Sequence, residues 1–573
     1  EITTDMEHDM PSLISPRTKI LLASAALVVW PTTANAQMLG TDWSDLDEAS
    51  APAEDADAPA KRERTRRAEV SPYLEAKQVF LADLDDGGDV LTYSTLAVGV
   101  NAGITERNAE AQVNVRYERL IGYSSRLRDR DNLSGLARGN ARLGRNVSVE
   151  AGAYASRART DNRAATPGTF LGNQDNVSHV YSVYTGPTFA AQLDDVSVAS
   201  SLRAGYTKVD NGRAPALPTG QAAVPAFDDS VSYSAQASVA MQPGRLPVGW
   251  AVSAGWNRED ASQLDQRVDE KYLRADVTVP VTPTLALVGG VGYENVEVSE
   301  RDVLRDASGA PIRTADGRFV VDPASPRLNA YDSDGLIWDA GVLWRPSRRT
   351  SLEARYGHRY GSDTYYGSFS YAPSERMGIN VSVYDTISGF GGSLNRTLAG
   401  LPTQFNATRN PLSGDLGNCA FGTTGSACFG NALGSLRPVA FRSRGVSASM
   451  VTSAGGWDTG IAAGYNRQKY LSSALGALPE LEGMVDQNYY IAGYLGRDLD
   501  RRSRFETNVY GNLLDPGFAL APDIYSIGAN AAYYRQIWRG LSAGAAVGID
   551  SVKPEDADGD VSASALLGLR YSF

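Results

Sequence analysis

The order of connections along this chain restricts its fold more than any single motif does. From residue 71 on, apolar and polar residues alternate in segments of roughly ten to sixteen residues, as in the final run Val561–Phe573. Between the segments, short turns such as 143–146, 194–195 and 282–284 alternate with connections that are mostly long and polar. Only 84–89 and the turn around 362–363 are brief members of the long class.

These segments number about 22, within 20–24, and each is long enough to cross a bilayer when tilted, whereas soluble strands usually have about 5–6 residues. A strict alternation of short and long connections is typical of an up-and-down antiparallel barrel with tight periplasmic turns and extended surface loops. We therefore expect an all-β, transmembrane antiparallel β-barrel over 71–573, with an even number of strands and both termini in the periplasm. Its longest surface loops are expected at 300–334 and 391–442.

The N-terminal residues predict export. Arg17 and Lys19 precede the apolar run Ile20–Trp30, and Ala34-Asn35-Ala36 supplies a small-x-small cleavage site before Gln37. A membrane anchor is the alternative, but eleven residues at ~1.5 Å each cover about half of a ~30 Å hydrocarbon core. We expect residues 1–36 to hold an upstream extension and a signal peptide that starts at Met10 and is cleaved after Ala36.

Residues 37–70 are first acidic and then basic, with almost no large apolar side chains, which predicts a disordered periplasmic tail. The net charge of the whole chain is -12, which argues against nucleic acid as a partner. With 57 Gly and 28 Tyr, the composition favours β-structure with many turns.

The last strand carries a resemblance to a known family. Phe573, with Tyr571 two residues before it, resembles the C-terminal signal of Gram-negative outer-membrane β-barrel proteins, which the barrel-assembly machinery reads in that family. Residues 174–187 are similar to uncharacterised barrels of sphingomonad-type bacteria, which are sometimes labelled as the preprotein translocase subunit YajC. That subunit is a small one-span protein, and nothing in this chain resembles it. The resemblance implies the outer membrane as location, with its lipids and lipopolysaccharide as surroundings.

Charged residues on the inward-facing positions are the main candidates for a functional site. They occur in both signs, so they either tune the selectivity for a solute or pair with one another and stiffen the wall, and no preference for anions or cations follows. The expected lumen-lining residues are Glu110, Arg116, Glu118, Arg203, Arg274, Asp276, Asp339, Arg345, Glu353, Arg355 and Arg359.

Cys419 and Cys428 lie close together in the longest loop. In an exported chain such a pair favours a disulfide, and a metal site is disfavoured because no His or acidic residue lies beside them. We expect loop 391–442 to be folded and able to cover or enter the lumen. The acidic turns at 83–89 and 556–560 lack the spacing of an EF-hand, which favours solvated turns over calcium sites, and no cofactor is expected.

Outer-membrane phospholipases and deacylases resemble one another in a His-x-Ser pair, and neither His179 nor His358 stands in such a pair. An enzyme is therefore the third choice, and both histidines are expected at the interfacial belt.

A plugged receptor would need over a hundred residues before the barrel, which the tail does not supply. The leading hypothesis is a plugless, porin-like channel or exporter for polar solutes or polysaccharide, gated by loops 300–334 and 391–442. The alternative is a surface or adhesion barrel whose loops bind a partner.

Overall fold

The computed structural model describes residues 67–573 except 85–89, 125–126, 128, 161–175, 211–226, 315–316, 434–435, 519–520 and 556–557. The predicted signal-peptide residues Ala34, Ala36 and Gln37 and most of the predicted tail lie outside the described residues, as do parts of the acidic turns and of the 174–187 phrase.

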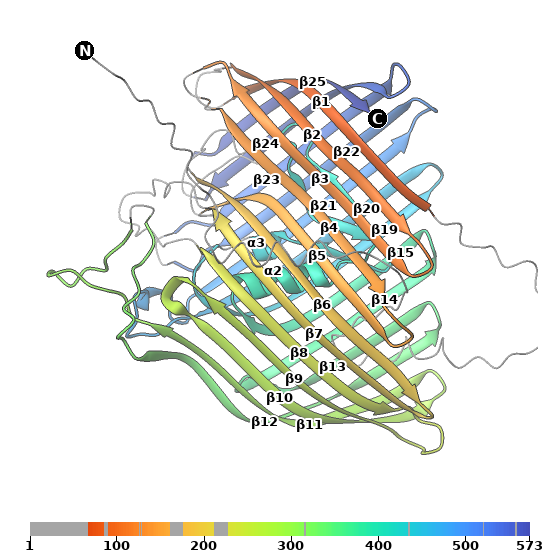
Figure 1. The fold of residues 1–573 in the computed structure, drawn as a ribbon, viewed down its shortest axis with the longest axis vertical. Coiled ribbons are helices and arrows are strands. Elements are labelled where there is room, and N and C mark those ends of the chain that lie inside the picture. The colour runs from red at the N-terminus through yellow and green to blue at the C-terminus, as the bar shows by residue number, and fades with distance from the viewer. Residues whose placement is uncertain are drawn as a thin grey trace, which may run out of the picture.

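Twenty-two strands form one antiparallel sheet that closes on itself, because β1 pairs with β2 on one side and with β25 on the other (Figure 1). The prediction of an up-and-down antiparallel barrel of about 22 strands is confirmed. The strands of the ring are β1 (Arg67–Asp83), β2 (Val90–Thr105), β3 (Ala109–Gly122), β4 (Arg130–Arg142), β5 (Val147–Arg159), β6 (Val177–Leu193), β7 (Val196–Asp210), β8 (Asp229–Met241), β9 (Gly249–Ala261), β10 (Arg267–Thr282), β11 (Leu285–Arg301), β12 (Arg327–Ser347), β13 (Thr350–Arg359), β14 (Ser362–Ser374), β15 (Met377–Ser388), β19 (Ala440–Ala454), β20 (Trp457–Leu471), β21 (Val485–Asp498), β22 (Ser503–Asp515), β23 (Ile524–Gln536), β24 (Leu541–Pro554) and β25 (Asp560–Ser572).

The two ends of the barrel differ in their connections. Every even-numbered connection of the ring is a short turn, and these turns share one end with both termini of the barrel, since Arg67 pairs with Thr105 and Ser572 with Tyr73. We call this the turn end and the opposite one the loop end. The connection 302–326 is shorter than the expected 300–334, because the ladder hydrogen bonds of β11 and β12 continue further. The connection 389–439 lies two to three residues earlier than the expected 391–442. The tight turn between β13 and β14 falls at 360–361, where both residues have positive φ.

The two faces of the sheet have opposite polarity. On β10, Leu273, Val277 and Val279 point outward and are 59%, 47% and 42% exposed, while Glu270 and Asp276 on the inner face are buried. Trp338, Trp344, Tyr356 and Tyr365 add exposed aromatic rings to the outside, and Trp338 contacts Tyr356 edge to face. An outer surface that is apolar around a polar interior is the arrangement of a transmembrane barrel.

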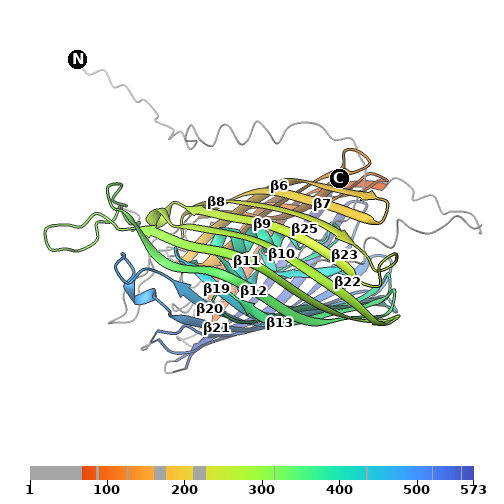
Figure 2. The same cartoon turned by 90° about the horizontal axis from the view of Figure 1, so that it is seen from below.

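The connection between β15 and β19 folds inside the ring of strands. It contains α2 (Phe390–Ala399), α3 (Gly430–Leu433) and a three-stranded sheet of β16 (Asn406–Arg409), β17 (Leu416–Gly422) and β18 (Gly425–Cys428). Both views show this connection within the barrel (Figures 1 and 2). We call residues 389–439 the plug. Within the described part of the chain, no helix combines the length and the apolar character needed to cross a membrane.

The connection 302–326 forms a separate module beyond the loop end, drawn green in Figure 2. Three short extended pieces pair in a closed triangle, in which Leu304 donates its N–H to Val320, Ile312 donates to Leu304 and Val320 donates to Ile312. The pieces recur every eight residues, and bridges join Val303 to Val321, Arg305 to Pro311 and Arg313 to Phe319. Val303 and Phe319 pack against the rim beside η3 (Gln263–Asp265) and η4 (Pro479–Leu481), so this loop caps the rim and does not enter the lumen.

Candidate functional site: the plug and the wall that holds it

The plug extends over the full height of the barrel. It enters at the loop end, where Ser388 pairs with Phe441, and it reaches the turn end, where Gln404 Nε2 donates to Thr105 Oγ1 at 3.4 Å. Thr105 is the last residue of β2. A solute that passes through this lumen therefore has to pass the plug.

Helix α2 packs on the inner wall through one apolar stripe. Phe390, Leu394 and Leu398 recur every four residues, which places them on one face of a helix, and each is at most 1% exposed. They form one cluster with Val180 and Tyr184 of the wall. The wall lies close to the helix at Gly205 of β7. A Cβ on Gly205 would lie 2.3 Å from the Asn395 side chain, so a glycine at this position leaves the space that the helix occupies.

Opposite charges from the wall hold the two ends of α2. Glu259 of β9 accepts the Gly389 N–H at 2.9 Å at the N-terminus of the helix. At the C-terminus, the Arg138 guanidinium of β4 donates to the carbonyl oxygens of Leu401 at 3.1 Å and Ala399 at 3.3 Å. A carboxylate at the N-terminus and a guanidinium at the C-terminus both interact favourably with the helix dipole and stabilise the helix. Both also satisfy backbone groups that a helix leaves unpaired.

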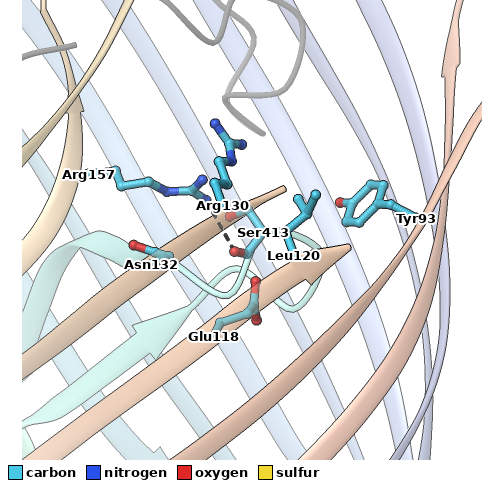
Figure 3. A pocket seen from close by; sticks show the side chains of 7 residues that line it. All are labelled: Tyr93, Glu118, Leu120, Arg130, Asn132, Arg157 and Ser413. Atoms are coloured by element: carbon cyan, nitrogen blue, oxygen red, sulfur yellow. Dashed lines mark hydrogen bonds between the residues drawn. The ribbon is translucent and has the colours of Figure 1, made fainter. Parts of the chain in front are cut away.

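A buried ion pair attaches the middle of the plug to β5. Arg157 donates through Nε to Asp415 Oδ1 at 2.8 Å, and Asn132 Nδ2 donates to the same oxygen at 3.0 Å. Arg157 also donates to the Ser413 carbonyl oxygen at 3.3 Å (Figure 3). Burial alone would raise the pKa of Asp415, but the charge of Arg157 and the hydrogen bonds from Arg157, Ser413 and Asn132 outweigh it and hold the pKa below its usual value.

A small pocket marks the seam between plug and wall beside this ion pair. Side chains of β2, β3, β4 and β5 converge on Ser413 of the plug (Figure 3). The pocket is lined by Tyr93, Glu118, Leu120, Arg130, Asn132, Arg157 and Ser413.

Two further polar contacts fix the plug to β3. The Gln112 side chain reproduces a backbone pairing with Phe405: its Nε2 donates to the Phe405 carbonyl at 2.6 Å, and its Oε1 accepts the Phe405 N–H at 2.8 Å. Arg409 donates through Nε to Asn114 at 2.8 Å and through Nη1 to Ser134 Oγ at 2.7 Å. Burial, together with the nearby charge of Arg116, lowers the pKa of Arg409 to about 10, so it stays charged at neutral pH.

On the opposite side, the hairpin of β17 and β18 packs against β20 and β21. Cys419 and Cys428 face each other in this hairpin and form a disulfide. Phe421 contacts the ring of Tyr494 with 5.0 Å between centroids, and it clusters with Ala462 and Ala492. The plug thus contacts both the first and the last strands of the chain, and it is seated on walls that lie across the lumen from one another.

The residues expected to line the lumen all lie on inward-facing positions, where the structure groups most of them in pairs. Arg116 contacts Glu118 and Glu75, and Arg203 contacts Glu150. One cluster joins Arg274 and Arg355 with Asp276, Asp339 and Glu353, and another joins Arg359 with Glu270 and Glu294. Glu110 accepts from Thr403 of the plug, and Arg345 lies on the same face of β12 as Asp339.

The other predicted residues lie at the rims. His179 and His358 are on outward positions near the loop end, where His179 stacks on Tyr181 and His358 lies opposite Trp338. Tyr571 and Phe573 are exposed on the outside at the turn end, with their rings 5.0 Å apart. Among the described residues, no group of three or more His, Cys, Asp or Glu side chains is arranged to hold a metal ion.

Sequence reasoning missed the residues that seat the plug: Arg138, Arg157, Glu259, Asn395 and Asp415. Inward position marked Arg138 and Glu259 as polar but did not single them out, and alternation places Arg157 on the outer face, because it pairs with His179. A compositional signal existed, because residues 389–439 contain twelve Leu, Phe or Val but Asp415 as their single acidic residue. A connection of that composition is expected to be buried.

No family model and no curated protein matches this chain. Matching solved structures include the FrpB iron transporter from Neisseria meningitidis (10% identity, 88% of this chain and 82% of that chain, TM-score 0.41). They also include BauA, the ferric preacinetobactin receptor from Acinetobacter baumannii (10%, 88% and 81%, 0.42), and Fiu, the ferric-catecholate import receptor from E. coli K12 in its open form (10%, 90% and 82%, 0.43). These likenesses concern the fold alone, and the similarity of 174–187 to sphingomonad-type barrels stays a prediction.

Proposed function

We propose that this protein is an outer-membrane channel or exporter for polar solutes, whose lumen is closed at rest by its own plug, residues 389–439. One observation carries the proposal: the plug runs from the loop end to Thr105 at the turn end. In this proposal the turn end faces the periplasm and the loop end faces the cell surface.

The polar contacts of the plug are of a kind that can be exchanged for contacts with water or solute. Side-chain hydrogen bonds and ion pairs attach it to the wall at Gln112, Arg138, Arg157 and Glu259. The plug is tethered at two neighbouring strands, β15 and β19, so it can leave the lumen through the loop end without breaking the barrel. This differs from the plugless channel that the sequence suggested, since a loop of the barrel supplies the closure.

The test is ion conductance in a planar bilayer. In the opening variant, a turn of about four Gly and Ser residues replaces 390–438, which suits the geometry because Ser388 already pairs with Phe441. We expect steps of much larger conductance than in the intact protein. A matched control replaces 303–324 by a similar turn, since Arg301 pairs with Arg327 and this module lies outside the lumen, and it is expected to conduct as the intact protein does. A barrel that folds but stays silent without its plug would refute the proposal.

The module 302–326 favours a second function, a surface barrel that binds a partner. It projects beyond the loop end and carries exposed Leu304 and Ile312, which are 39% and 40% exposed. The control variant separates the two functions: loss of whole-cell binding with unchanged conductance would assign the module to a partner. No observation favours an enzyme.

A further inference from the structure

The ionised side chains inside the barrel differ in how much water they meet. Among the described residues, twelve carboxylates are buried but only four guanidinium groups are. The buried carboxylates are Glu118, Glu150, Glu259, Glu270, Asp276, Glu294, Glu300, Asp339, Asp385, Asp415, Asp486 and Asp550. The buried guanidinium groups are those of Arg116, Arg138, Arg157 and Arg355. Carboxylates are therefore shielded from water more often than guanidinium groups are.

The same asymmetry holds within single ion pairs on the inner wall. Arg203 of β7 is 30% exposed, whereas its partner Glu150 is 7% exposed. Arg359 is 27% exposed, against 4% for Glu270 and 2% for Glu294. In each case the short carboxylate lies against the wall and the longer guanidinium lies between it and the lumen.

A third pair repeats the arrangement at mid-height. Arg274 is 17% exposed, against 7% for Asp276 and 5% for Asp339. The order is reversed for Arg116, which is 3% exposed against 10% for Glu75, and for Arg355, at 3% against 14% for Glu353. Near the turn end, Arg504 is 33% exposed, less than Asp458 at 40% and Glu506 at 42%. The exposed guanidinium groups of Arg203, Arg274 and Arg359 therefore lie at the middle and the loop end of the wall.

Aromatic rings keep two of these guanidinium groups in place. The guanidinium carbon of Arg203 lies 5.5 Å from the Tyr184 ring centroid, and that of Arg359 lies 4.6 Å from the ring of Tyr360 and 5.4 Å from that of Tyr272. Such contacts hold a cation over a ring, and the N–H groups beyond those that donate to Glu150, or to Glu270 and Glu294, remain available as donors. A carboxylate or phosphate is the chemistry that a guanidinium donor recognises best.

We propose that the solutes of this channel are small anions bearing carboxylate or phosphate groups, which the exposed edges of Arg203, Arg274 and Arg359 guide through the lumen. This inference rests on the proposed transport function and names its substrate class. From the sequence, the presence of both signs of charge on the wall implied no preference for anions or cations. The structure favours anions, because a solute meets the more exposed guanidinium group of these pairs first.

The test is the reversal potential of the conducting protein in a potassium chloride gradient, with the plug replaced as above so that current flows. We expect chloride to permeate roughly threefold better than potassium, since a unit charge a few ångströms away is only partly screened by salt. Inorganic phosphate and citrate, added singly on the loop side, are expected to reduce the chloride current, and the stronger of the two identifies the group preferred.

Variants that leave the net charge of the protein unchanged show whether the selectivity comes from the exposure of the charged groups or from their number. Arg203→Gln with Glu150→Gln and Arg274→Gln with Asp276→Asn each remove one charge of either sign. Arg355 keeps Asp339 and Glu353 as partners. Arg138, whose contacts with Leu401 and Ala399 leave with the plug, keeps the Gly139 carbonyl oxygen and the ring of Tyr184. We expect the four changes together to abolish the preference for chloride. The control pair Arg119→Gln with Asp131→Asn, at 44% and 48% exposure on the outer rim, is expected to leave it unchanged.

Three outcomes are distinguishable. A chloride preference that the fourfold variant loses, and that Arg203→Lys with Arg274→Lys retains, supports the proposal. A conducting channel that prefers potassium, or a preference that survives the fourfold change, overturns the anion proposal and leaves the transport function intact. A folded protein that is silent with and without its plug overturns both.

Discussion

The buried pair of Arg157 and Asp415 makes the seating of the plug open to a quantitative test. The change is Asp415→Asn. Both side chains are almost fully buried, at 4% and 6% exposure, and the carboxylate accepts hydrogen bonds from Arg157 and Asn132. Removing one member of a buried ion pair costs about 3–5 kcal/mol, because the other charge stays buried without a counterion.

Asparagine keeps one acceptor oxygen for Arg157, so the lower end of that range applies, about 3 kcal/mol. At about 1.4 kcal/mol for each factor of ten, the ratio of seated to released plug should fall roughly a hundredfold. The barrel itself should be unaffected, because its ladder hydrogen bonds do not involve Asp415.

Amide hydrogen exchange measured on peptides of the refolded protein reads this ratio directly. We expect peptides within 389–439 to exchange roughly a hundredfold faster in the variant, while those of β10–β14 keep their rates. The control is Asp131→Asn, whose pair with Arg119 is exposed and is expected to change nothing. Unchanged exchange of the plug in Asp415→Asn would refute the reasoning, and recovery in the exchanged pair Arg157→Asp with Asp415→Arg would confirm that charge pairing is the cause.

Three further results are expected. A Cβ on Gly378 would lie 1.9 Å from the Thr423 carbonyl oxygen, so Gly378→Ala should unseat the β17–β18 hairpin and raise conductance while heat-modifiable migration in gels shows an intact barrel. Replacing Cys419 and Cys428 by Ala should destabilise the hairpin by about 2–3 kcal/mol, seen as faster exchange there with an unchanged melting temperature of the barrel, and equal exchange would argue against it. Because the pKa of Asp415 is held below its usual value, its pair with Arg157 stabilises the seated plug fully above that usual value and loses effect only as pH falls through the lowered one. The ratio of plug exchange rates between Asp415→Asn and the unchanged protein should therefore be constant between pH 5 and 8 and should approach one only in strong acid, and a change of that ratio near neutral pH would contradict this.

The strands could be predicted from the sequence because their signal is local. In β10, the residues from Leu273 to Val279 show their face by their own polarity, and the short turns set the register of each hairpin. Inward positions of Arg274, Asp276 and Arg355 followed from the same alternation. Their ion pairs could not be predicted, because alternation shows which face a residue lies on and does not show which residue three strands away lies beside it.

The plug could not be predicted in the same way. Its residues show no period of two, and Phe390, Leu394 and Leu398 give a helical signal only once a wall for that stripe is known. The partners of Gln112 and Asn132 lie 293 and 283 residues along the chain, at Phe405 and Asp415. A folded loop able to enter the lumen could therefore be predicted from the sequence, but the contacts that seat it could not.

The plug also depends on the barrel being complete. Strands β3–β9, which hold α2 and Asp415, precede the plug in the chain, but β20 and β21, which hold the hairpin at Phe421, follow it. During synthesis and insertion, one half of the seat exists before the plug and the other half only after it. A truncated or unfinished barrel would carry a hairpin with no surface to cover it, and an exposed Phe421 would mark that chain as incomplete until the last strands close the ring.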